Sequence, residues 1–279
     1  MTAAVSPPSS TDLRHKRYPS DLSRKEWRAI RSHLAQAPGP GRPRTVDIRL
    51  VINAIFYVVR SGCQWRMAPT DYPNWSTVYY YFRKWTRDGA WQRLNDVLRE
   101  LVRRLAHKEA TPSAAIIDTQ SVKTTEAGGP RGFDAFKRVM GRKRHIVVDT
   151  LGLLLVVVIH AASIQDPAGA KLVLSKVQGR FPRLALIWAD GIYASVTDWV
   201  QEQLRCALVI VARDPAQKGF RVLPKRWIVE RTFGWFNRYR RLSKDYEQDP
   251  RMSEAIVYLA SIRLMLRRLD RNKRFIPAA

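Results

Sequence analysis

The spacing of hydrophobic positions changes near residue 110 and divides the chain into two parts. Before this point, apolar residues recur every three or four positions, which predicts helices. After it, short β-branched runs predict strands: AAIIDTQSV, RHIVVDT, LLLVVVIH, LALIWADG and CALVIVA. Helical patterns separate the later strands, and the chain closes with helices. We therefore predict a tail over 1–18, a helical domain over 19–108, and a mixed α/β sheet covered by helices over 109–279.

Local signals place several helix ends. Capping boxes are predicted where Ser23 precedes Glu26 and where Ser195 precedes Asp198, and Ser76 is predicted as an N-cap. Another helix is predicted to stop at Gly62. Short helices with tight turns favour a helix-turn-helix DNA-binding domain, and a plain helical bundle is the alternative.

The net charge of +25 is spread over both parts of the chain. A polyanionic partner, most commonly nucleic acid, accounts for such a charge, and a merely basic soluble protein is the alternative. Only Cys63 and Cys206 are present and no CxxC pair occurs, so neither a disulfide scaffold nor a zinc site is indicated. No apolar run reaches membrane-spanning length. We expect a reduced, cytoplasmic protein.

Three carboxylates occupy distinctive positions. Asp118 and Asp190 each end an apolar strand, where a carboxylate is costly unless it is paired or bound to metal. Glu230 lies in a helix whose apolar residues share an arc of about 120°: Ile228, Val229, Thr232, Trp235, Phe236 and Tyr239. Glu230 lies on the opposite side with basic residues. Together the three supply hard oxygen ligands for Mg²⁺ or Mn²⁺. The alternatives are turn caps for the aspartates and i,i±4 ion pairs for the glutamate.

Basic side chains near these elements are candidate phosphate contacts. They are Arg226, Arg238, Arg241, Lys143 and Arg144. For Lys143 and Arg144, a solvated charge run is the alternative. His145 and His160 are interpreted as strand residues rather than ligands. The aromatic residues of STVYYYFRKW suit either stacking on DNA or core packing.

Several motifs together resemble the DDE transposases of bacterial insertion sequences, in the group named IS five. In the second part these are IIDTQSVKT, GRKRHIVVDTLGLLL, WADGIY and RWIVERTFGWFNRYRRLSKDYE. In the first part, YPSDLSRKEW through GCQWRMAP, and YYYFRKW, resemble the helical domain of that group. The resemblance covers nearly the whole chain. It implies an RNase H-like catalytic fold, with the first aspartate on strand one, the second after strand four and the glutamate on a later helix.

The matching positions are Asp118, Asp190 and Glu230. The resemblance implies that they hold two Mg²⁺ or Mn²⁺ ions for phosphoryl transfer. It also implies that the partners are double-stranded DNA, as terminal inverted repeats and as target, that the protein acts as a homodimer on DNA, and that it is associated with the nucleoid.

The wider insertion-sequence class has Tyr, two residues, Arg, three residues, Glu, six residues and Lys. Arg226 and Glu230 match, whereas Leu223 and Asn237 stand at the tyrosine and lysine positions. Arg238 or Lys244 is the candidate replacement for the lysine. Two alternatives share these features: a metal-dependent nuclease that cuts without rejoining, and a DNA-binding regulator that does not cut.

Overall fold

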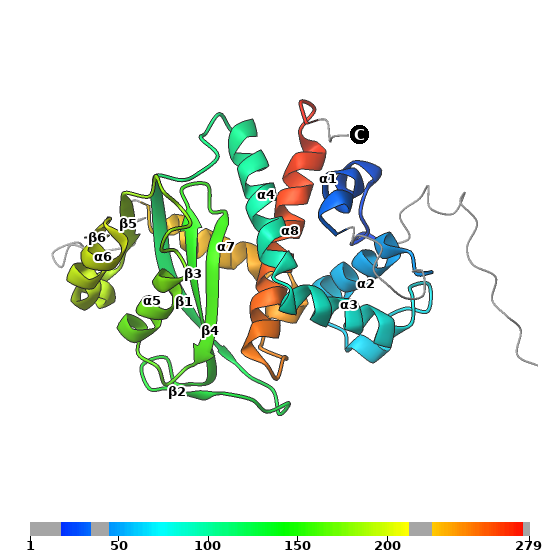
Figure 1. Ribbon diagram of the computed structural model, residues 1–279. Helices are drawn as coiled ribbons and strands as arrows, with labels where there is room; N and C mark the ends of the chain where they lie inside the picture. The colour runs from blue at the N-terminus through cyan, green and yellow to red at the C-terminus, as the bar shows by residue number, and fades with distance from the viewer. Residues whose placement is uncertain (1–17, 35–44, 212–224, 276–279) are drawn as a thin grey trace, which may run out of the picture.

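The computed structural model describes residues 18–34, 45–211 and 225–275. A mixed sheet lies at its centre with helices on both faces, and further helices pack against one side (Figure 1). The predicted tail lies outside the described residues except for Tyr18. The Tyr18 hydroxyl donates to the Asp71 carboxylate at 2.6 Å. None of the described helices combines the length and apolar character needed to span a bilayer.

Helices form where the three- and four-residue spacing predicts them. Those of the first part are α1 (Arg24–Leu34), α2 (Ile48–Ser61), the 3-10 turn η2 (Trp65–Met67), α3 (Trp75–Arg87) and α4 (Ala90–Leu105). Those of the second part are α5 (Asp166–Ser175), the 3-10 helix η3 (Gly191–Val196), α6 (Thr197–Leu204), α7 (Trp227–Phe236), the 3-10 turn η4 (Arg240–Leu242) and α8 (Pro250–Arg271).

Two of the predicted helix ends are confirmed by hydrogen bonds and backbone angles. The Ser23 N–H donates to Glu26 Oε2 at 2.7 Å, and the Glu26 N–H donates to Ser23 Oγ at 3.0 Å, so the capping box forms. The φ angle of Gly62 is +75°, a left-handed conformation that favours glycine, and its N–H donates to the Val58 carbonyl.

Two predicted helix starts are wrong. Asn74 caps α3 by accepting the Ser76 N–H at 2.9 Å, so Ser76 is already inside the helix. Ser195 lies within η3, which runs directly into α6, and no side chain caps α6. Asn74 and Ser76 are both suitable cap residues near the start of α3, and the path of the preceding backbone selects Asn74.

The sheet contains the five predicted strands and one further strand. They are β1 (Ala114–Lys123), β2 (Gly132–Asp134), β3 (Val139–Asp149), β4 (Leu154–Ala161), β5 (Leu186–Ala189) and β6 (Ala207–Ile210). β3 pairs antiparallel with β1, β2 and β4, whereas β1, β5 and β6 run parallel. The short β2 was not predicted. This order, with β1 between β3 and β5, is RNase H-like, so the predicted fold class is confirmed.

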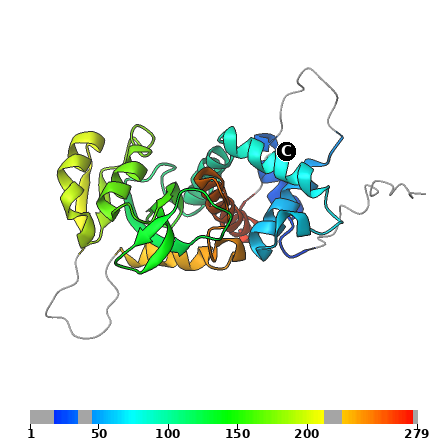
Figure 2. The same cartoon turned by 90° about the horizontal axis from the view of Figure 1, so that it is seen from below.

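Each face of the sheet contributes to a separate hydrophobic core. Ile116 and Ile117 of β1 enter different cores, because successive side chains of a strand point to opposite faces. The larger core joins one face to α7, α8 and the helices of the first part, and the smaller core joins the other face to α5 and α6. Figure 2 shows α5 and α6 at one end, the first helices at the other, and the sheet and α8 between them.

α4 and α8 lie side by side between the sheet and helices α1 to α3 (Figure 1). At this contact the side chain of Asn95 donates to the Leu154 carbonyl at 2.9 Å and accepts from the Ser261 hydroxyl at 2.8 Å. Arg103 donates to the buried carboxylate of Asp149. The larger core is therefore continuous across residue 108. The division into two functional domains at that residue stays a prediction.

Candidate active site

Asp118 and Asp190 lie at the same edge of the sheet. β1 and β5 are neighbouring parallel strands in which Ile116 pairs with Trp188, and each aspartate follows two residues later. Asp190 follows the carboxyl end of β5, whereas Asp118, which was predicted to end its strand, lies within β1, which continues to Lys123. The parallel pairing of β1 with β5 brings together these two residues, which are 72 positions apart in the sequence. Asp118 and Asp190 are both half-buried, and Asp190 Oδ1 accepts the Ile192 N–H at 2.9 Å.

The pKa of the Asp118 carboxyl reflects its burial and its position near Asp190. Burial raises the pKa of the Asp118 carboxyl to about 6, and the neighbouring charge of Asp190 acts in the same direction. The Thr119 N–H, which donates to Asp118 Oδ1 at 2.7 Å, opposes the rise, as do the charges of Arg226 and Lys137. Two repelling carboxylates at one edge form a favourable place for a cation.

Glu230 reaches the same edge from the first turn of α7. Arg226 connects it to Asp190: the Nη2 atom of Arg226 lies 3.4 Å from Asp190 Oδ2 and 3.9 Å from Glu230 Oε1. The Glu230 side chain is 59% exposed, whereas that of Arg226 is 21% exposed. The i,i+4 pair predicted as the alternative role for Glu230 is therefore present, and the same arginine also contacts the second aspartate.

The packing of α7 positions these two side chains. Four residues of the predicted apolar arc lie on α7 and are buried: Ile228, Val229, Thr232 and Phe236. The Thr232 hydroxyl donates to the Gly152 carbonyl at 3.1 Å, which ties the helix to the turn between β3 and β4. The opposite face carries Arg226, which contacts Asp190, and Glu230, which contacts Arg226.

The carboxylates at this edge provide part of the ligand set that a hard divalent cation needs. Asp118 and Asp190 supply carboxylate oxygens that repel each other, as Mg²⁺ or Mn²⁺ sites require. Within residues 18–34, 45–211 and 225–275, no three His, Cys, Asp or Glu side chains are grouped closely enough to hold one ion. In this arrangement Glu230 is turned to Arg226. The pair of aspartates fits the ion, and the assignment of all three as ligands stays a prediction.

Comparisons with known proteins match both parts of the chain to transposase families. Residues 22–95 match the family model described as putative transposase of IS4/5 family. Residues 109–265, more than half of the chain, match the family model described as transposase DDE domain. The chain belongs to the DDE transposases. Its second part is accordingly a domain of the polynucleotidyl transferase and nuclease type. No curated protein and no solved structure matches the chain.

Of the basic residues predicted to contact DNA, three lie at the surface of the transposase in positions that phosphate can reach. Arg238 and Lys244 are exposed, and Arg226 is partly exposed beside the carboxylates. For these three residues, DNA contact stays a prediction. The tyrosine position of the wider class, Leu223, lies outside the described residues.

The prediction for Arg144 and Arg241 is corrected by their burial. Arg144 donates to the carbonyls of Leu242 and Lys244 at 2.7 and 2.9 Å. Arg241 lies 2.7 Å from the buried carboxylate of Glu247. The helix predicted to carry Arg241 ends at Phe236, so the side of that helix cannot be extended to residue 241. Both arginines are buried, and their hydrogen bonds and ion pair hold the segment between α7 and α8.

Lys143 is also buried and paired inside the transposase. Its ammonium group lies 2.8 Å from Asp166 and 3.8 Å from Asp134, and it donates to the Ile164 carbonyl at 3.0 Å. The physical reason is the position of β3 between β1 and β4, with helices over both faces of the sheet. Neither phosphate contact nor a solvated charge run, the two interpretations of this sequence, describes it.

His145 and His160 are strand residues, as predicted, and form a buried hydrogen-bonded chain with Tyr193 that the sequence did not indicate. His145 Nε2 is 2.9 Å from the Tyr193 hydroxyl, and His145 Nδ1 is 3.0 Å from His160 Nε2. Burial lowers the pKa of both imidazoles. These hydrogen bonds connect η3, which directly follows Asp190, to β3 and β4.

Lys137 is a second residue that the sequence analysis missed. It lies in the turn between β2 and β3, and its ammonium group donates to the Thr119 carbonyl at 3.4 Å. Its charge lowers the pKa of Asp118. The sequence pattern did not predict β2, so it gave no reason to expect that this turn lies near β1.

Proposed function

We propose that this transposase binds the terminal inverted repeats of its insertion sequence, cleaves DNA there and joins the freed end to target DNA, with Mg²⁺ or Mn²⁺ as cofactor. One observation carries the proposal: Asp118 and Asp190 each lie two residues beyond the last paired residues of the neighbouring parallel strands β1 and β5, and Arg226 contacts both Asp190 and Glu230. Ligands of α/β proteins bind beyond the carboxyl ends of parallel strands, where Asp190 follows β5. The net charge of +25 supports a DNA partner.

The side chains at this edge have distinct roles in the proposal. Asp118 and Asp190 hold the divalent ions, and Glu230 is the third carboxylate. Two bound ions supply activation of the attacking hydroxyl and stabilisation of the leaving oxygen. Arg226 keeps Asp190 and Glu230 together and helps to keep Asp118 ionised. Lys137 contributes a second positive charge near Asp118.

The proposed reaction consists of two phosphoryl transfers. In cleavage, water attacks a phosphodiester, whose 3′ oxygen leaves as a hydroxyl and whose phosphate stays on the 5′ side. In joining, that 3′ hydroxyl attacks a phosphodiester of the target, so one bond forms for each bond broken and no oxidant is needed. Since two ends must be joined to one target, a homodimer on DNA, acting in the cytoplasm at the nucleoid, is part of the proposal.

The test is cleavage of a duplex that carries the element's own ends, with Mg²⁺, by the wild type and by Glu230→Gln. Glu202→Gln on α6 is the matched control, because it makes the same change at an exposed glutamate far from the sheet edge. We expect cutting by the wild type and the control, and none by Glu230→Gln, with equal DNA binding by all three proteins.

The other outcomes separate the alternatives. Cutting without joined products supports the nuclease. Specific binding by wild type without any metal-dependent cutting supports the regulator. Full activity of Glu230→Gln removes Glu230 from the site.

A further inference from the structure

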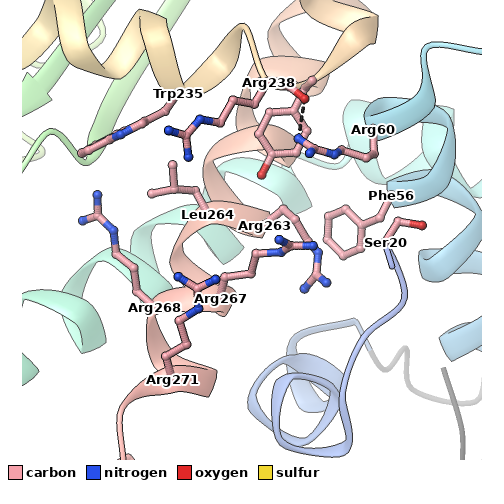
Figure 3. A pocket seen from close by; sticks show the side chains of 11 residues that line it. Ser20, Phe56, Arg60, Trp235, Arg238, Arg263, Leu264, Arg267, Arg268 and Arg271 are labelled. Atoms are coloured by element: carbon pink, nitrogen blue, oxygen red, sulfur yellow. Dashed lines mark hydrogen bonds between the residues drawn. The ribbon is translucent and has the colours of Figure 1, made fainter. Parts of the chain in front are cut away.

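A cavity of about 280 Å³ opens between α2, the end of α7 and α8, and arginines dominate its lining. The arginines are Arg60, Arg238, Arg263, Arg267, Arg268 and Arg271. In Figure 3, Arg60 and Arg238 approach the cavity from one side, and Arg267, Arg268 and Arg271 of α8 approach it from the other. Asp118, Asp190 and Glu230 are not among the lining residues. This arginine pocket, defined by these six residues, is therefore distinct from the candidate active site.

The positive charge of the arginine pocket is largely uncompensated. No acidic side chain is among the described residues that line it. Arg263 is neutralised from behind by the buried carboxylate of Glu26. In the described part of the chain, no hydrogen bond or ion pair engages the side chains of Arg238 and Arg271, and both are exposed. Like charges gathered without counter-charges are unfavourable unless an anion binds among them.

The pKa of the buried Tyr239 hydroxyl is affected by the positive charge of the arginine pocket. Burial raises the pKa of Tyr239, and the charges of Arg60, Arg238, Arg263 and Arg267 all act to lower it. Four arginines of the pocket are thus close enough to influence one phenol. They come from α2, from the residues after α7, and from α8, so the tertiary structure assembles this charge from distant parts of the sequence.

Aromatic rings and carbonyls orient several of these guanidinium groups in advance. Arg268 lies over the ring of Trp235, 4.6 Å from its centroid, and Arg60 lies 5.5 Å from the centroid of Tyr239. Arg60 also donates to the Arg238 carbonyl, the dashed bond of Figure 3. A guanidinium has five N–H donors, so each one retains donors for a ligand after making these contacts. Oriented guanidinium groups suit the paired oxygens of phosphate.

The position of the pocket indicates that the phosphate belongs to DNA. Arg226 and Glu230 lie at the first end of α7, and Trp235 and Arg238 lie at the other. A ten-residue helix spans about 15 Å, which is the axial length of about four base pairs of duplex. The two sites are therefore about 15 Å apart along the axis of α7, a distance within the length of one bound duplex.

We propose that the arginine pocket is a second DNA-contact site, which holds backbone phosphates about four base pairs from the cleaved bond. This inference rests on the proposed function, because it takes the cleaved bond to lie at the three carboxylates. It goes beyond that function by assigning a binding site to α2 and α8. In this proposal the helical first part and the catalytic part both contact the same duplex.

The test compares two variants with equal loss of charge. Arg238→Gln combined with Arg271→Gln removes two exposed arginines of the pocket. Arg183→Gln combined with Arg205→Gln removes two exposed arginines near β5 and α6, at the other end of the molecule (Figure 1). DNA affinity is measured by fluorescence anisotropy at several salt concentrations, on a duplex carrying the element's ends. Thermal unfolding is measured for every variant.

We expect the pocket variant to bind at least tenfold more weakly than the control variant. We also expect the slope of log affinity against log salt to become shallower by about 1.8, since each lost phosphate contact removes about 0.9. Replacing the same two arginines by lysine should restore most of the slope, because the charges return. Neutral methylphosphonate linkages about four base pairs from the cut should weaken binding of the wild type and leave the pocket variant unaffected.

Two failures are distinguishable. If wild type binds and cuts the ends but the pocket and control variants have the same affinity and salt slope, the arginine pocket is not a DNA site and the proposed function stands. If wild type neither binds nor cuts these ends, the proposed function itself fails.

Discussion

The guanidinium of Arg226 lies 3.4 Å from the carboxylate of Asp190, so the second aspartate of the site has a protein cation beside it. The same group lies 3.9 Å from Glu230 and lowers the pKa of Asp118. One arginine therefore touches or influences all three carboxylates. Its charge competes with that of any divalent ion at the same edge, while its position orders two of the carboxylates.

Arg226→Gln should separate these two effects. We expect the maximal rate of DNA cleavage to fall roughly 10- to 100-fold, which corresponds to losing one charge-assisted hydrogen bond. We also expect the Mg²⁺ concentration for half-maximal rate to fall several-fold, because a competing positive charge is gone. Cleavage rates across a Mg²⁺ titration measure both. Lys225→Gln removes an adjacent exposed charge and should change neither; an increased Mg²⁺ requirement in Arg226→Gln would contradict the competition.

Arg241→Ala should affect folding rather than DNA contact. The substitution leaves the buried Glu247 carboxylate without its partner and removes a hydrogen bond to the Cys63 carbonyl. Breaking a buried ion pair costs about 3–5 kcal/mol of unfolding free energy. Urea denaturation measures this loss. The neighbouring Arg240 is exposed, so Arg240→Ala is the control and should lose far less stability; equal losses would show that burial of Arg241 does not matter.

The buried histidines should make the protein less stable in acid. Burial lowers the pKa of His145 and His160, and the charge of Lys143 acts in the same direction. The unfolded chain therefore binds protons at these sites more readily than the folded chain. Their contribution is complete above about pH 6.5 and is lost as the pH falls below it.

His145→Gln should flatten this dependence by up to about 1.4 kcal/mol per pH unit, the value for one proton. The measurement is urea denaturation of wild type and variant at several pH values between 5 and 7.5. His33→Gln, at an exposed position on α1, is the control and should keep the wild-type slope. If His145→Gln keeps the wild-type slope of stability against pH, protonation of the buried histidines is not the cause of that slope.

Gly169 of α5 faces the two histidine rings closely. A Cβ atom there would lie 2.5 Å from His160 Nε2 and 2.6 Å from His145 Nδ1. Both rings are buried and bonded to each other, so Gly169→Ala should cost about 1–3 kcal/mol. Gly234→Ala on α7 meets no atom within 4 Å and should instead stabilise the protein by up to about 1 kcal/mol. Denaturant midpoints for the two variants should therefore shift in opposite directions.

The sequence by itself determined the features that depend on near neighbours along the chain. Strand and helix periods predicted five strands and the main helices, because alternation and 3.6-residue spacing follow from local geometry. It also placed Asp190 directly after a strand, whereas the prediction that Asp118 ends its strand was wrong, because β1 continues to Lys123. The capping box at Ser23 is equally local.

Only the tertiary structure decided which charges are available to a ligand. Arg144, Lys143 and Arg241 look alike in the sequence to Arg226 and Arg238. The first two lie on β3, which is covered on both faces, and the third follows the end of α7. The arginine pocket joins side chains from α2, from the residues after α7 and from α8, separated by up to 211 positions between Arg60 and Arg271. Burial and long-range assembly depend on which surfaces pack together, and no local pattern contains that information.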